Sequence, residues 1–428
     1  MKSSRAYRSR SVKQLRPEEV TKGRGGSGVH VGLDVGKEQI YATLRWGTRD
    51  FSRPWKAANP SELGTLVEAL CAVGRGRSMV VAMEPTGTYG DALRQSMSDS
   101  GLVVHRVSPK ASHDYAEIFD GVPSQHDGKD AAIVAELSSL GKSSVWAFGQ
   151  TEWEDELSYW VDWMDAQRRT LVIWYGRLEG LLSRHWPEAT RLLPLSSGVL
   201  LRSIAHYGSP AALSSDAAAS DRLRRWGRGH LSEAKCAELL RSAGESVGVR
   251  ASEPTRRRLR VYAEQSLSCR LEVSRSRQGL QKLCGKHEVI ASQGEVVGFV
   301  TACVLWSHLG DPRQYDSGAA YRKAMGLNLK ERSSGKWHGR VKISKRGSSQ
   351  VRRWLYFSAL RWVKRPEVKG WYEAKKARRE GDRTEAMRGL VGVMRKLALA
   401  LYQVGAGKRF DAGLLFPGSS VLSAGERG

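Results

Sequence analysis

Four carboxylate residues in the first third of the chain lie in short motifs that could together hold divalent metal. Asp34 lies in GLDVGK, Glu84 in VAMEPTG, and Asp127 and Asp130 in HDGKDAAIVAEL. The first two come at the ends of expected strands of one sheet, and the i, i+3 spacing of the two aspartates in the third motif places both on one helix face. Four carboxylates that converge repel one another unless cations lie between them. Such oxygen ligands suit Mg²⁺ or Mn²⁺, and a pair of these ions about 4 Å apart can activate a nucleophile and stabilise a leaving oxygen in phosphodiester chemistry.

Each of these carboxylates also has an ordinary structural explanation. Asp34 can be a turn residue, and Glu84 can simply end a strand. Asp127 follows Ser124 by three residues, which is the spacing of a capping box at a helix start. Each motif is weak alone, and the metal-site interpretation depends on their occurring together in a strongly basic chain.

A second group of residues near the C-terminus combines cations with a hydroxyl. Apart from Glu331, the charged residues of this segment are all basic: Lys330, Arg332, Lys336, Arg340, Lys342, Lys345, Arg346, Arg352 and Arg353. A loop of this charge is expected to face phosphate. Ser333 and Ser334 lie near its centre, either as part of a plain turn or, for Ser334, as a nucleophile whose attack on phosphate the cations would assist.

Three tryptophans lie among or just after these cations. Trp337, Trp354 and Trp362 could stack on nucleic-acid bases. For the latter two, packing in a helical core is the expected use.

The overall charge points to a polyanionic partner. The 428 residues carry 69 Lys and Arg against 44 Asp and Glu, a net charge of +25. No run of eighteen apolar residues favours a membrane, so nucleic acid is the expected partner. The five cysteines are scattered without CxxC spacing, which argues against a disulfide framework or a zinc site. The basic N-terminus lacks the apolar stretch of a secretory signal, so we expect a cytoplasmic protein.

The elements that must position the carboxylates belong to an α/β layered domain. Alternation and β-branched residues predict strands over 29–35, 39–46, 78–84 and 102–107, and helical patterns cover 61–74 and 88–100. The first two strands are joined by a tight GK turn, and strands then alternate with helices. This order is typical of RNase H-like folds.

A long helix is predicted over 152–185. Its apolar seam has steps of four and three: Trp153, Leu157, Trp160, Met164, Gln167, Leu171, Trp174, Leu178 and Leu181. This heptad pattern favours a coiled coil with Gln167 as its polar register position, and the alternative is a core helix packed within the monomer. A second helical run from Thr255 to Lys286 could return antiparallel to it.

The remaining segments are less informative. We expect residues 1–28 to be a flexible basic arm without structure, and residues beyond 406 to fray. Residues 187–252, with Pro, Gly, Ser and short helical patterns, are interpreted as an insertion. Residues 290–405 are expected to be mostly helical.

The motifs, taken in order, carry a resemblance. GLDVGK, MEPTG, HDGKDAAIVAEL and GLNLKERSSGKWHGRVKISKRGSSQVRRWL resemble the DEDD transposases of the insertion-sequence family one-ten, the bridge-RNA-guided recombinases. The likeness covers about 29–185 and 290–400. It implies a RuvC-like DEDD domain 29–150 joined through a coiled-coil linker 151–289 to a mostly α-helical Tnp domain 290–405. The flexible arm 1–28 and the insertion 187–252 look like additions to this common core, and 406–428 is the expected flexible tail.

The resemblance also implies an activity and its partners. In that family the acidic quartet, here Asp34, Glu84, Asp127 and Asp130, binds divalent metal, Mg²⁺ or Mn²⁺, and a serine, here Ser334, attacks DNA. A structured guide (bridge) RNA pairs with donor and target double-stranded DNA, and we expect a homodimer that assembles to a tetramer on DNA, in a bacterial cytoplasm and associated with the nucleoid. Two departures are that the usual glycine-rich turn is degenerate here as SQGEVVGFVTA, and that Ser333 stands beside Ser334.

Other functions stay open from the residues alone. A RuvC-like junction resolvase would use only the carboxylates. An actin-like sugar kinase or ATPase would share a GLDVGK-type phosphate loop, although the later glycine pairs are missing and the charge suits it poorly. An RNA-binding scaffold would need no catalytic residue at all.

Overall fold

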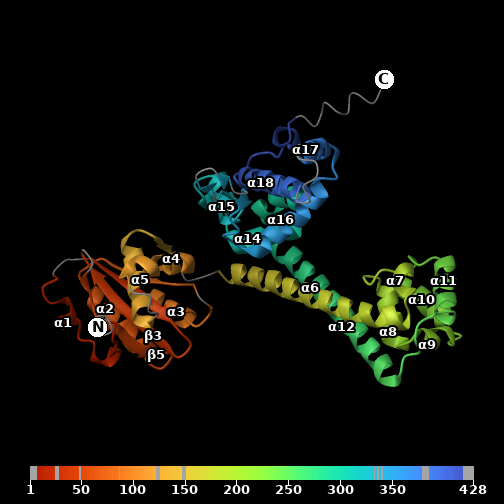
Figure 1. The fold of residues 1–428 in the computed structure, drawn as a ribbon, viewed down its shortest axis with the longest axis horizontal. Coiled ribbons are helices and arrows are strands. Elements are labelled where there is room, and N and C mark those ends of the chain that lie inside the picture. The colour runs from red at the N-terminus through yellow and green to blue at the C-terminus, as the bar shows by residue number, and fades with distance from the viewer. Residues whose placement is uncertain are drawn as a thin grey trace. The chain divides into compact units, whose positions relative to one another are not determined.

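The computed structural model describes most of the chain. The described residues are 7–24, 28–47, 50–85, 87–121, 126–146, 151–331, 333–334, 337–338, 341–377 and 385–417. The chain divides into two compact units, Met1–Gln150 and Thr151–Gly428. Figure 1 shows a mixed sheet with helices in the first unit and an almost wholly helical second unit.

The first unit is built on one mixed sheet. Its strands are β1 (Arg10–Ser11), β2 (Val29–Val35), β3 (Gln39–Trp46), β4 (Asp50–Phe51), β5 (Trp55–Ala58), β6 (Met79–Met83), β7 (Val104–Val107) and β8 (Ser143–Val145). The strand order is β1-β5-β3-β2-β6-β7-β8, with β4 paired to β3. β2 runs antiparallel to β3 and parallel to β6, and β6 runs parallel to β7. The four predicted strands and the hairpin at the GK turn are therefore confirmed.

Four helices of the first unit accompany the sheet. They are α2 (Leu63–Gly74), α3 (Asp91–Asp99), α4 (Pro109–Phe119) and α5 (Asp127–Ser139). The two predicted helices, α2 and α3, are confirmed with later starts. α5 has an apolar face of Ala and Val residues that is almost wholly buried. It packs on the centre of the sheet, where β2 lies (Figure 1).

The contact between α5 and β2 is a direct approach of two backbones. A Cβ at Gly32 would lie 2.0 Å from the carbonyl oxygen of Ala131 and 2.3 Å from the amide nitrogen of Ala135. Only glycine allows so short a distance, since any side chain would push the helix away. Small residues on both elements therefore set the depth of α5 on the sheet.

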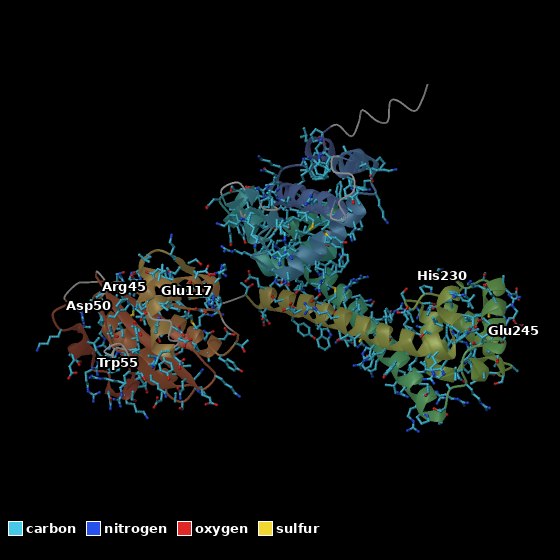
Figure 2. All side chains as sticks on the ribbon, in the orientation of Figure 1. Arg45, Asp50, Trp55, Glu117, His230 and Glu245 are labelled. Atoms are coloured by element: carbon cyan, nitrogen blue, oxygen red, sulfur yellow. The ribbon has the colours of Figure 1, made fainter. Side chains whose placement is uncertain are left out.

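Two ion pairs attach α5 to its surroundings. Arg45 of β3, labelled in Figure 2, pairs with Glu136, and both side chains are largely buried. Lys129, which is 2 % exposed, pairs with Asp120 at 2.7 Å. Removing one partner of a buried pair leaves an uncompensated charge, so these pairs specify the rotation of α5 as well as its position.

The N-terminal arm is structured over its described residues, so the prediction of a flexible arm over 1–28 is wrong for 7–24. β1 pairs parallel with β5, and a short helix α1 (Pro17–Thr21) follows a 3₁₀ turn, η2 (Val12–Gln14). Val12 and Leu15 are buried in the core of the first unit. The open edge of β5 and these two apolar side chains order a segment whose composition is otherwise basic.

Two long helices form the spine of the second unit. α6 (Glu152–His185) begins with a capping box between Thr151 and Glu154, and α12 (Glu253–Cys284) lies against it. Their direction is antiparallel, because Trp153 bonds to the carbonyl of Leu283 near one end and Trp163 bonds to Glu272 further along. The predicted long helix and its antiparallel return are confirmed. The seam residues are buried or half-buried, and the intrachain partner α12 accounts for the burial.

A helical bundle occupies one end of this spine, where the sequence predicted an insertion. Its helices are α7 (Ala189–Leu192), α8 (Gly198–Tyr207), α9 (Pro210–Ser214), α10 (Ala219–Gly227) and α11 (Glu233–Gly244). They share an apolar core with Leu178 and Leu182 of α6 and Leu259 of α12. The short helical patterns in 187–252 thus fold onto the spine.

The C-terminal helices form a core at the other end of the spine. They are α13 (Glu288–Val297), α14 (Phe299–Leu309), the turn η3 (Pro312–Gln314), α15 (Gly318–Ala324), α16 (Ser349–Trp362), α17 (Pro366–Ala377), α18 (Glu385–Gly405) and α19 (Ala412–Leu415). Leu157, Val161 and Met164 of α6 belong to this core. The predicted flexible tail is wrong for 406–417, because Phe416 is 1 % exposed and packs against Trp362.

The backbone contact at Gly32 generates a prediction. Gly32→Ala should destabilise the first unit by at least the roughly 1–3 kcal/mol typical of overpacking, because the atoms it meets belong to backbone and cannot rotate away. Thermal unfolding measured by circular dichroism should show the loss, at about 2–4 °C per kcal/mol. Gly64→Ala, in a helical position with nothing within 4 Å, is the matched control and should be neutral or gain up to about 1 kcal/mol. An unchanged melting temperature for Gly32→Ala would contradict the close approach.

Candidate functional site

Asp34 is the second-last residue of the central strand β2. The parallel register of β2 and β6 pairs Leu33 with Met83. Asp34 and Glu84 are therefore the next residues along these two neighbouring segments. On the other side, the antiparallel register places Asp34 opposite Tyr41 of β3. The site is thus at a strand end, as the sequence predicted.

Asp127 and Asp130 lie in the first turn of α5. The helix begins after His126, whose ring nitrogen Nδ1 accepts a hydrogen bond from the amide of Gly128 at 3.1 Å. Asp127 is therefore the first helical residue, and the capping-box alternative, which requires an acid at the third, is wrong. A helix N-terminus carries a partial positive charge that favours acidic side chains there.

The structure brings three of the four predicted carboxylates together. Oxygens of Asp34, Asp127 and Asp130 lie within 4.8 Å of one another. The glycine contact explains this distance: Gly32 and Asp34 share one face of β2, and α5 approaches that face closely enough for its first turn to reach Asp34. Glu84 is half-buried beside this group and is not within the same 4.8 Å cluster.

Crowding of the carboxylates changes their protonation. The pKa of Asp34 is raised to about 7, first because the group is buried and then because of the charges of Asp130, Asp127 and Glu84. Burial, followed by the charge of Asp127, also raises the pKa of Asp130. A cluster that raises carboxylate pKa values in this way would be relieved by a bound cation.

Tyr41 is a site residue that the sequence reasoning missed. Burial raises its pKa, and the charge of Asp127 and a hydrogen bond with that carboxylate raise it further. Its hydroxyl also lies 3.0 Å from Oε1 of Gln39, to which it can donate. The sequence could have indicated Tyr41, because it lies opposite Asp34 across the GK hairpin and residues opposite each other in a tight hairpin share a face.

The donor set fits a hard divalent cation. Three carboxylates that converge from a strand and a helix provide oxygen ligands without nitrogen or sulfur, which is the preference of Mg²⁺ and Mn²⁺. A bound cation would offset the carboxylate charges that, after burial, raise the pKa of Asp34.

A polar cavity of about 500 Å³ lies at the ends of β6 and β7 and the start of β8. Pro85, which follows Glu84, lines it together with Arg106 and Lys142 and the hydroxyl residues Ser143 and Ser144. Cations in this cavity provide a place for the phosphate backbone of a nucleic acid whose reacting phosphate lies at the carboxylates. The sequence reasoning did not single out these residues.

The serine segment forms two short antiparallel ribbons in place of a simple loop. β9 (Leu329–Lys330) pairs with β12 (Lys342–Ile343), and between them β10 (Ser333–Ser334) pairs with β11 (Trp337–His338). The backbone of Ser334 is opposite that of Trp337. Of the predicted cations, Arg332, Lys336 and Arg340 lie outside the described residues.

The other predicted cations of this segment divide into two groups. Lys342, Lys345 and Arg346 are exposed. Arg352 donates to the carbonyl of Gly347 at 2.8 Å, and Arg353 pairs with Asp165 of α6. The last two therefore also anchor α16, a use that competes with the predicted contact to nucleic acid.

The tryptophans next to this segment belong to the core, as expected. Trp354 and Trp362 are 7 % and 2 % exposed, and Nε1 of Trp362 donates to the carbonyl of Val296 at 2.8 Å. They are not available to stack on bases. Within the degenerate segment SQGEVVGFVTA, Gly298 joins α13 to α14 at a φ of 90°.

Comparison with known families supports a mobile-element enzyme. Residues 291–373 match the family model described as "Transposase IS116/IS110/IS902 family". This segment lies in the second unit and contains the serine ribbons, whereas the acidic cluster lies outside it. The match supports an insertion-sequence transposase that acts on DNA. No curated protein matches the chain significantly. Among the helices of the described residues, none has the length and apolarity to cross a membrane.

The crowded acidic group generates a prediction about stability. Asp34→Asn should raise the melting temperature in EDTA at pH 8, because the amide removes a charge that the folded state disfavours. Since the folded pKa of Asp34 lies near 7 and the unfolded value near 4, the advantage should be nearly absent below pH 4, grow between pH 4 and 7, and level off above pH 7. Differential scanning calorimetry should show about 2–4 °C per kcal/mol of repulsion removed.

The same measurement tests the cation. Mg²⁺ or Mn²⁺ should raise the melting temperature of the wild type and much less that of Asp34→Asn. Glu117→Gln removes an exposed carboxylate on α4, labelled in Figure 2, and should respond to metal as the wild type does. Identical curves with metal and with EDTA for the wild type would contradict the metal site.

Proposed function

We propose that the protein is an RNA-guided, site-specific DNA recombinase of an insertion sequence. The observation that carries the proposal is the convergence of Asp34, Asp127 and Asp130 in a strongly basic chain whose residues 291–373 match a transposase family. A carboxylate group suited to divalent metal and a transposase-like segment together suit the cutting and rejoining of DNA.

The first unit supplies the acidic site. Asp34, Asp127 and Asp130 would hold Mg²⁺ or Mn²⁺. Glu84, which follows the neighbouring strand β6, would be a further ligand. The ions, when bound, supply Lewis acidity to the attacking and leaving oxygens of a phosphodiester. Tyr41 orients the carboxylate of Asp127, and Arg106 and Lys142 hold the flanking phosphates in the cavity at the ends of β6 and β7.

The second unit supplies the nucleophile. The hydroxyl oxygen of Ser334 attacks a DNA phosphorus and forms a phosphoserine ester, while one bridging oxygen of the DNA leaves and takes up a proton. A second DNA hydroxyl then attacks the same phosphorus, releases the serine and restores the phosphodiester. Because each step exchanges one ester for another, no external energy source is needed. Lys342, Lys345 and Arg346 would offset the charge of the attacked phosphate.

The choice of DNA sequence is assigned to a structured guide RNA. This part of the proposal rests on the resemblance of the four motifs to the bridge-RNA-guided recombinases and on the net charge of +25, which suits a large RNA partner. The RNA would pair with donor and target DNA, and a homodimer that assembles to a tetramer would hold both.

One alternative function has a specific observation in its favour. The acidic cluster alone would suffice for a RuvC-like junction resolvase, in which the serine ribbons would only bind DNA. The match over 291–373 favours transposition. The kinase and scaffold alternatives have no such support among the described residues.

The serine mechanism predicts a covalent intermediate. Ser334→Ala should retain DNA and RNA binding but give no protein–DNA adduct on a denaturing gel, whereas Ser333→Ala should still form it. Asp130→Ala should abolish cleavage with binding nearly intact, because loss of one ligand spoils the geometry of the shared metal site. An adduct that persists in Ser334→Ala and vanishes in Ser333→Ala would move the nucleophile by one residue. An active wild type without any adduct would favour the carboxylate-only resolvase.

The guide RNA predicts a specific bound species. RNA that co-purifies with the protein should sequence to one structured transcript, and recombination should require it, because shape and backbone contacts select a folded RNA. Binding should fall by roughly 10³–10⁵ between 50 and 200 mM salt if six to ten phosphates are contacted. Equal recombination with a non-cognate RNA of the same length would contradict RNA guidance.

A further inference from the structure

A second cationic feature of the Thr151–Gly428 unit lies apart from the serine ribbons. A cavity of about 360 Å³ opens among α15, α17 and α18. Its charged lining consists of Arg322 from α15, Lys375 from α17, and Arg388, Arg395 and Lys396 from α18. None of its described lining residues is acidic. We call this cavity the α18 groove.

The sequence of α18 explains why the groove exists. Arg388 and Arg395 are seven residues apart and share one helix face, and Lys396 lies about 100° around the helix from Arg395. Between them, Gly389 and Gly392 have no side chains, and a Cβ at these positions would meet Tyr372 at 2.6 Å and Trp371 at 3.0 Å. The two aromatic rings of α17 therefore reach the backbone of α18, and the cations project around them.

Two arginines of the groove each have an unsatisfied donor atom among the described residues. The Nε atoms of Arg322 and Arg395 are buried without a hydrogen-bond partner among the described residues. Lys375 and Lys396 flank the ring of Trp371 at 5.5 and 5.3 Å. Nζ of Lys396 donates to the carbonyl of Leu415 at 2.5 Å.

These like charges also disfavour one another. Burial, and then the charge of Arg322, lowers the pKa of Arg395. Burial, and then the charge of Lys375, lowers the pKa of Lys396. Half-buried charges of one sign that lie close together cost folding free energy, and a bound polyanion would remove that cost. A merely solvated surface would place the same charges further apart and more exposed.

We propose that the α18 groove binds the phosphodiester backbone of a nucleic acid, with Arg322 and Arg395 as its central phosphate ligands. Guanidinium groups present several donors in a plane and match phosphate oxygens well. The groove is too polar for an apolar ligand, and its cations continue over three helices, which suits an extended chain of phosphates. The inference does not depend on the chemistry assigned to Ser334 or to the acidic cluster.

The salt dependence of binding tests the groove. Duplex DNA and the co-purifying RNA are titrated separately by fluorescence anisotropy from 50 to 300 mM NaCl. Arg322→Gln/Arg395→Gln should weaken binding in at least one of the two arms and reduce its log–log salt slope by about 1.8 for a duplex or about 1.4 for a single strand, because two phosphate contacts are lost. The arm that changes identifies DNA or RNA as the occupant.

Two control variants separate charge from folding and from general basicity. Arg322→Lys/Arg395→Lys keeps both charges and should keep most of the salt slope. Lys408→Gln/Arg409→Gln removes two exposed charges from the same unit, outside the groove, and should leave the slope unchanged. If Arg322→Gln/Arg395→Gln behaves like this control in both arms, the proposal is overturned.

A measurement on the wild-type protein avoids any effect of substitution on folding. Acylation of lysines with an N-hydroxysuccinimide ester, read by mass spectrometry, should be slowed at Lys375 by bound nucleic acid several-fold more than at Lys408. Equal protection at the two lysines would contradict the groove. Because neither experiment requires strand cleavage, its outcome is independent of the recombinase proposal.

Discussion

The candidate active site depends on one steric contact, the approach of the α5 backbone to the β2 backbone at Gly32. The distances of Asp127 and Asp130 from Asp34 follow from it, because Asp34 lies two residues further on the same face of the strand and the first turn of α5 lies over that face. A single methyl group at Gly32 would lift the helix by more than the tolerance of a metal site. The ion pairs of Arg45 with Glu136 and of Lys129 with Asp120 then fix the rotation of α5 about its own axis. The geometry of the site is therefore a consequence of packing between small residues.

Charge distribution is the second organising feature. In the first unit, burial and then the charges of neighbouring carboxylates raise the pKa of Asp34 to about 7, and the second unit gathers cations in the α18 groove and along the serine ribbons. Neither arrangement stabilises the isolated protein. Groups of like charge are retained in folded proteins where a ligand of opposite charge completes them. Divalent cations for the first and phosphates for the second would be such ligands, and DNA or RNA chemistry uses both together.

The spine of α6 and α12 has a different role, because it joins two separate apolar cores. Leu157, Val161 and Met164 enter the core of the C-terminal helices, whereas Leu178 and Leu182 enter the bundle of α7 to α11. The antiparallel partner α12 buries the heptad seam within the chain. The exposed faces of the spine, including Val172 at 70 % exposure, remain available to further partners.

Several features were determined by local sequence alone. The strands around Asp34, the hairpin at the GK turn, the helical pairing of Asp127 with Asp130, and the long helix from Glu152 all follow from periodicity within short windows. Such patterns are visible because backbone preference and side-chain alternation act between near neighbours.

Other features were decided by tertiary structure, because they depend on partners remote in sequence. Val12 and Leu15 order a basic arm only because β5 offers an open edge, and Phe416 orders the tail only because Trp362 leaves space for it. Arg353 pairs with Asp165, a residue far away in the chain, which no local pattern reveals. The groove on α18 likewise requires α15 and α17 to bring Arg322 and Lys375 beside it. The function of a charged or apolar side chain depends on the residues that it contacts. Those contacts are set by how whole helices and strands pack, which local sequence does not determine.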